Sequence, residues 1–78
     1  MTERRYREEI DRFQAKDDDG KVFTIVEYQH MIEITLSGKI SIAKGTKGMF
    51  LTNGHSVNYI DDETFEVVET GKFIRRVR

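Results

Sequence analysis

The longest regular pattern in the chain runs through residues 22–36, where β-branched and aromatic residues dominate. Even positions are apolar almost throughout, and odd positions are mostly polar after Ile25. Alternation with a period of two is typical of a strand with one buried face. Since a slip of one residue would expose the whole apolar set, one parity held over this length predicts a single long strand. We expect it to bend around a small core and to end at Ser37-Gly38.

Short apolar runs alternate with turn signals in the second half of the chain, which is the rhythm of consecutive hairpins. Asn53-Gly54 is the strongest short hairpin signal, and a two-residue loop there places Phe50 opposite Val57. The glycine-flanked segment 44–48 is interpreted as a flexible loop. The strands expected in this half are 40–42, 49–52, 56–60, 65–69 and 72–77.

The last hairpin has two possible registers. A two-residue loop at Thr70-Gly71 sets Glu69 opposite Lys72 and Glu66 opposite Arg75, which makes two favourable charged pairs. A bulge at the glycine shifts the register and removes both pairs. The sequence leaves the two registers open.

The first dozen residues fit two structures. Thr2 has the chemistry of a helix cap, and three apolar side chains follow at positions that share one face of a helix. The other structure is a strand at about 6–16 that leads into the turn Asp17-Asp18-Asp19-Gly20, whose composition suits a hairpin. We prefer the strand because the long strand at 22–36 needs a pairing partner.

Six or seven short antiparallel strands predict an all-β fold, either a small barrel or a rolled sheet, with a short N-terminal helix as the open alternative. Proline, linkers and repeats are absent, so a single small β domain is expected over residues 1–78. The expected core consists of Phe13, Val22, Val26, Tyr28, Ile32, Ile34, Leu36, Ile42, Phe50, Val57, Phe65, Val67 and Ile74.

Composition limits the classes of function. The sequence contains no cysteine, which excludes disulfides and thiolate zinc sites. Thirteen basic and fourteen acidic residues give a net charge of −1, which favours no class of partner. No apolar run follows the charged start, and none approaches the ~20 residues of a membrane span. We therefore expect a cytoplasmic protein without a membrane partner.

No residue pattern predicts catalysis, a cofactor or a metal site. His30 is expected to be a hydrogen-bonded core side chain on the apolar face, and His55 to be an exposed residue at a hairpin tip. A calcium loop with Gly20 at its sixth position has Ala15 and Val26 at positions that require oxygen ligands. We therefore expect the protein not to be an enzyme.

Arginine and aromatic residues alternate near both ends of the chain. Small β-barrels bind single-stranded nucleic acid with basic grooves and stacking rings. If the terminal strands lie side by side, these side chains form one patch. The alternative is ordinary solvated charge at a sheet edge, which discourages aggregation. The candidate nucleic-acid-binding residues are Arg5, Tyr6, Arg7, Arg75 and Arg76.

The stretch Val57–Gly71, with the pattern VNxIDDxTFExxxTG, and the later Ile74-Arg75-Arg76 resemble the ending of a set of small uncharacterised bacterial proteins. The upstream segment Asp19–Val26 is similar in the same set, and together these segments cover under half of the chain. The resemblance implies a bacterial origin and an all-β domain. It implies no activity, ligand or functional residue.

Two functions fit these observations. The first is a non-enzymatic protein-interaction module that binds another protein or a second copy of itself, because free strand edges accept a further strand. The second is single-stranded nucleic-acid binding through an edge formed by the two termini. A phosphate binder should gather the terminal arginines on one face, whereas an interaction module should expose an apolar patch or a bare strand edge.

Overall fold

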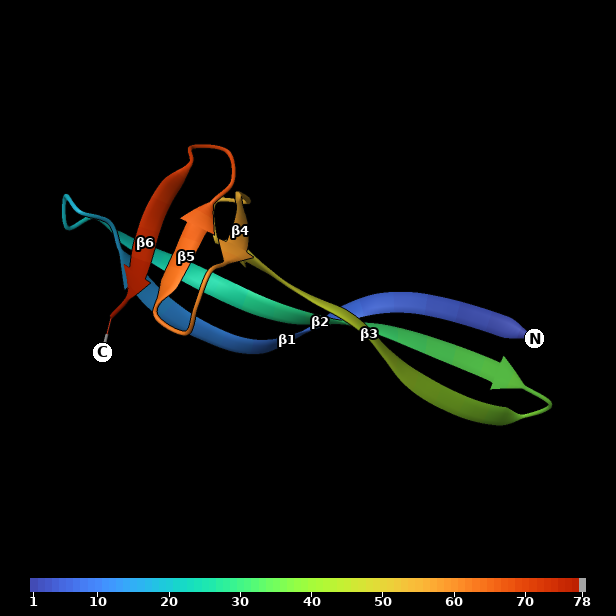
Figure 1. The fold of residues 1–78 in the computed structure, drawn as a ribbon. Coiled ribbons are helices and arrows are strands. Elements are labelled where there is room, and N and C mark those ends of the chain that lie inside the picture. Colours follow the sequence, from blue (N-terminus) through green and yellow to red (C-terminus); the bar gives the residue numbers. More distant parts are fainter. Residues whose placement is uncertain (78) are drawn as a thin grey trace.

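The structure is a computed structural model that describes residues 1–77, and these residues form six antiparallel strands and no helix. The strands pair in chain order, and β6 returns to β1, so the sheet closes into a barrel (Figure 1). The all-β antiparallel barrel and the N-terminal strand predicted from the sequence are confirmed. The strands are β1 (Thr2–Lys16), β2 (Val22–Leu36), β3 (Lys39–Leu51), β4 (Ser56–Tyr59), β5 (Thr64–Val67) and β6 (Lys72–Arg76).

The barrel closes at only one end of its three long strands. β1 meets β6 at Ala15 and Lys16, and β3 meets β4 at Met49 and Phe50. Away from these contacts β1 and β3 pair only with β2, so residues 2–9 and 28–48 form a three-stranded sheet that we call the extension. Figure 1 shows it twisting away from β4, β5 and β6 toward the N-terminus. The molecule is accordingly elongated, with extents of 55 × 24 × 19 Å.

The core lies inside the barrel, where all six strands contribute buried side chains and β2 contributes Ile25 from its odd positions. Ile25 is fully buried beside Ala15 and Leu51, while Phe13 packs against this cluster from its edge. Five residues of the expected core are buried, namely Val26, Val57, Phe65, Val67 and Ile74.

The even positions of β2 were expected to form the core, and for the far half of the strand this expectation is wrong. Leu36 is 56% exposed, and Val22 at the other end of the strand is 46% exposed. Ile42 of β3, also expected in the core, is 57% exposed. The physical reason is that β2 turns odd residues such as Ile25 into the barrel, so its even apolar stripe lies on the outside of the barrel and continues onto a sheet that has no second layer. Tyr28, Ile32, Ile34 and Phe50 are half-buried.

The hairpins β3–β4 and β5–β6 both have longer loops than the two-residue loops considered from the sequence. Phe50 lies opposite Ser56, so the predicted pairing with Val57 is wrong by one residue. Gly54 adopts a φ of +94° and donates its N–H to the Leu51 carbonyl at 2.8 Å, which makes a three-residue loop closed by a left-handed glycine. In the last hairpin Val67 pairs with Lys72, and the charged pairs of the two-residue loop do not form.

The segment 44–48 was expected to be a flexible loop, and it is instead part of continuous β3. A β-bulge absorbs its extra residue, since Gln29 pairs with Lys47 but Met31 pairs with Lys44. The buried Gln29 amide holds the bulge by donating to the Gly45 carbonyl at 2.7 Å.

No helix long and apolar enough to cross a membrane occurs in residues 1–77.

Candidate interaction surface

The extension has an outer face that continues the outside of the barrel. Because Ile25 points into the core, the even residues of β2 point to the opposite side of the sheet. Along the extension this side carries a row of mainly apolar side chains. The row consists of Tyr28, His30, Ile32, Ile34 and Leu36.

The two strands beside β2 give this face different borders. On β1, Arg5 lies opposite Ile32, one position along the face from Arg7. On β3, Ile32 faces Ala43, and the following position holds Ser41. The outer face therefore has a charged border on β1, where Arg5 and Arg7 lie between Glu3 and Glu9, an apolar middle and a border of mainly small side chains on β3.

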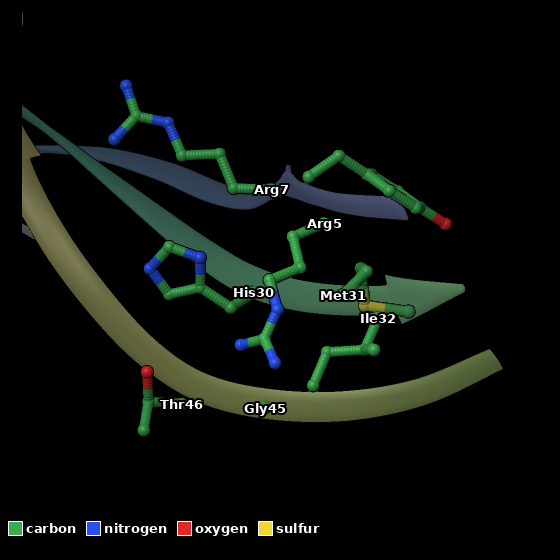
Figure 2. Close-up of a pocket in the computed structure, with 8 residues that line it drawn as sticks. Arg5, Arg7, His30, Met31, Ile32, Gly45 and Thr46 are labelled. Carbon is green, nitrogen blue, oxygen red and sulfur yellow. The ribbon is translucent and has the colours of Figure 1, made fainter. Parts of the chain in front are cut away.

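A hollow of about 640 Å³ lies on the extension. Arg5 reaches from β1 across β2 toward Gly45, while the side chain of Arg7 points away from it, as Figure 2 shows. An added methyl group at Gly45 would stand 3.4 Å from the His30 Cβ, so the small residue keeps this side of the hollow open. The lining residues are Arg5, Tyr6, Arg7, His30, Met31, Ile32, Gly45 and Thr46.

Aromatic rings hold Arg7 at the base of the extension. Its guanidinium carbon lies 5.0 Å from the ring centre of Tyr28 and 4.9 Å from that of Phe50. The two rings are 5.6 Å apart, and the His30 ring meets Tyr28 edge-on at 5.2 Å. The Tyr28 ring covers Gly48 so closely that a side chain at this position would collide with it. We call these side chains the base cluster.

Other charged side chains of the extension are tied to one another. Arg5 pairs with Glu3 at 2.7 Å, and Arg4 of the same strand pairs across to β2. At the base, Arg12 donates a 2.8 Å hydrogen bond to Glu9, and this bond lowers the pKa of the Glu9 carboxyl. These exposed pairs contribute little to stability because water screens them, but they fix the direction of the side chains.

The structure places the candidate nucleic-acid residues in two separate regions. Arg5, Tyr6 and Arg7 lie on the extension, whereas Arg75 and Arg76 lie on β6 of the barrel. β6 meets β1 about nine residues beyond Arg7, which corresponds to roughly 30 Å of strand. Arg76 is also engaged, because its guanidinium carbon lies 3.8 Å from the ring centre of Phe13. The two groups of arginines therefore do not lie side by side.

The two histidines lie in different parts of the fold, His30 on β2 and His55 in the loop before β4. The prediction that His30 is a core residue is wrong, because its side chain is exposed on the outer face. Within residues 1–77, no side-chain hydrogen bond joins His30 or His55 to a carboxylate, and no group of three His, Asp or Glu residues is placed to hold a metal ion. The arrangement on the extension is suited to binding through apolar and cationic groups.

Charge is divided unevenly between the two parts of the molecule. The extension contains six Lys and Arg against four Asp and Glu, while the rest of the chain contains seven against ten. The small overall net charge therefore hides a basic extension and an acidic barrel. Sequence reasoning missed this division because it depends on which segments lie together.

Sequence reasoning also missed the surface that β3 offers. Ile40 is 65% exposed and Ile42 is 57% exposed, on a strand that has no neighbour on its far side. One signal could have indicated it, since a strand of fifteen residues spans about 50 Å, far more than a small barrel covers.

Comparison of the chain with protein-family models, curated proteins and solved structures found no match.

Proposed function

We propose that the protein is a non-enzymatic protein-interaction module and that the extension is its docking surface. The observation that carries this proposal is a three-stranded sheet of a single layer that continues the apolar stripe of β2 into solvent. A sheet normally buries one face against another element, whereas the extension has no second layer. Leu36, at the end of the stripe, is 56% exposed.

The extension also offers main-chain groups to a partner. β1 and β3 pair only with β2 there, so each strand leaves a row of N–H and C=O groups unpaired along its outer side. Edges of this kind bind extended segments of other proteins by adding a strand. The proposal includes a bacterial protein in the cytoplasm, which the resemblance of the C-terminal segment and the cysteine-free sequence support.

The test is affinity capture from an extract of the cells that make the protein, with half of each sample treated with nuclease. The test variant is Ile34→Asp with Leu36→Asp, and the matched control is Val68→Asp with Phe73→Asp on the barrel. We expect protein partners to survive nuclease and to be lost at least tenfold with the test variant only. Equal recovery with both variants would overturn the proposal. Circular dichroism checks that each variant is folded. If the double test variant is unfolded, Leu36→Asp alone replaces it as the test variant.

Single-stranded nucleic acid is the second candidate, and the excess of basic residues on the extension favours it. Arg5 lies beside the hollow, and Tyr6 lines it as a ring on which a base can stack. Binding of a fluorescent single-stranded DNA at low salt should then weaken about tenfold or more in Arg5→Ala with Arg7→Ala, and should not change in Arg75→Ala. Absence of binding at low salt would remove this candidate.

A further inference from the structure

The two free edges of the extension differ sharply in chemistry. On β1, six of the eight residues from 2 to 9 are charged. On β3, Lys39 is the single charged residue in the segment 39–43, and Ile40 and Ile42 are both more than half exposed. Charged side chains protect an edge against pairing, whereas exposed β-branched residues favour it. The β3 edge is therefore the better acceptor of a further strand.

We propose that the edge formed by residues 39–43 pairs antiparallel with the same segment of a second copy of the chain. The two-fold axis stands perpendicular to the sheet at Ser41. This inference rests on the proposed function, because it names the partner of the docking surface. A two-fold contact of this type uses the same patch on both copies and closes after two chains.

The β3 segment is complementary to itself in this register. Each Ile40 lies opposite Ile42 of the second copy, Ser41 lies opposite itself, and each Lys39 lies opposite Ala43 of the second copy. Cross-strand pairs of β-branched residues stabilise a sheet, and no like charges meet. The joined sheet has six strands with both β3 strands at its centre.

The β1 edge fails the same test in every register that is centred on residues 3–9. A two-fold axis at Tyr6 sets Arg5 against Arg7 and Glu3 against Glu9 of the second copy. An axis at any other residue from 3 to 9 sets a charged side chain against its own copy. Like charges directly opposite one another are destabilising. Among registers that pair five residues or more, only the β3 edge therefore allows a symmetric pair without charge repulsion.

The shape of the molecule leaves room for this dimer. β3 runs from the tip of the extension toward the barrel, so an antiparallel second copy places its barrel beyond that tip (Figure 1). A two-fold axis perpendicular to the sheet keeps both outer faces on the same side. The apolar rows that end at Leu36 in the two copies then share one face of a wider sheet.

The size of the contact predicts weak association. Five residues span about 17 Å, and a sheet is about 10 Å thick, so the edge covers about 170 Å² per copy. Stable interfaces bury about 800 Å² per partner, so we expect dimers only above roughly 0.1 mM protein. The low affinity leaves the same edge available to other extended segments.

Single-cysteine variants test the inference directly, because the natural chain has no cysteine. Ser41→Cys and the control Val68→Cys, both at exposed positions, are treated at 0.5 mM (roughly five times the association threshold expected above) with a short bifunctional thiol reagent. We expect covalent dimers at least tenfold faster for Ser41→Cys. Adding Ile40→Lys and Ile42→Lys to that variant should abolish the difference, while adding Phe73→Lys should not.

Equal rates of cross-linking for the two cysteine positions would overturn the inference. So would a sedimentation coefficient that stays at the monomer value up to about 1 mM of the unmodified protein. The proposed function fails separately, when capture of protein partners does not depend on Ile34 and Leu36. If the protein stays monomeric but the substitutions at Ile34 and Leu36 still abolish the capture of protein partners, the proposed dimer is refuted and the proposed function is not.

Discussion

Gly48→Ala should disrupt the base cluster, and Gly45→Ala is its matched control. Both glycines lie on β3 with ordinary negative φ, so neither substitution strains the backbone. A methyl group at Gly48 would enter the space of the Tyr28 ring, whereas one at Gly45 would rest 3.4 Å from the His30 Cβ. Overpacking of this kind costs about 1–3 kcal/mol, and the displaced ring also loses its contact with Phe50.

The expected melting temperature falls accordingly for Gly48→Ala. A loss of 1 kcal/mol shifts the midpoint of a domain this size by about 4–8 °C, so a fall of at least about 4 °C is expected. Gly45→Ala should change it by less than about 3 °C, or raise it slightly, since removing a glycine also restricts the unfolded chain. Thermal unfolding followed by circular dichroism measures both.

A double-variant cycle checks that the Tyr28 ring is the cause. In a Tyr28→Ala background the methyl group at Gly48 has free space, so the same substitution should cost less than about 0.5 kcal/mol. Equal melting temperatures for the two glycine variants, or an undiminished cost in the Tyr28→Ala background, would refute the reasoning.

Three further outcomes follow from the barrel and the bulge. Phe65→Ala should lower the free energy of unfolding by about 3–5 kcal/mol in urea titrations, whereas Phe73→Ala, exposed on β6, should change it by under about 0.5 kcal/mol. Gln29→Ala should cost about 1–3 kcal/mol in the same titrations, because it leaves the bulge carbonyls without a donor. The Asp61 carboxylate accepts a hydrogen bond from the main-chain N–H of Glu63, and this bond is the main cause that lowers the pKa of Asp61. The ionised carboxylate therefore stabilises the fold above about pH 4, and this stabilisation is lost as the pH falls through the folded-state pKa of Asp61. Asp61→Asn should therefore flatten the acid side of the stability profile.

The local chemistry of the turns explains why the strands were predictable. Asp17 accepts N–H bonds from Asp19 and Lys21, so the turn before β2 forms as its composition indicates. Its carboxylate is nearly buried, which the composition of the turn alone does not indicate. Loop length was harder to predict, because Gly54 and Gly71 can take the left-handed conformation at more than one position of a loop.

The extension was not predictable because alternation does not show what covers a face. The even residues of β2 have the pattern of a buried stripe, yet only Val26, which lies beside the barrel, is buried. Segment 44–48 looked flexible because of its glycines, and the contact that orders it comes from Gln29 on another strand. The terminal arginines do not form one patch, because β1 and β6 pair only at Ala15 and Lys16 and the length of β1 separates Arg5 from that contact.

The measurement that tests the central claim most directly is photo-cross-linking from single positions in cells that make the protein. A photoreactive amino acid replaces Leu36 on the outer face of the extension in one variant and Val68 on the barrel in another, two residues of similar exposure. We predict covalent adducts with polypeptide from position 36 and few or none from position 68. Equal yields from the two positions, or adducts from position 68 alone, would contradict the assignment of the extension as a docking surface.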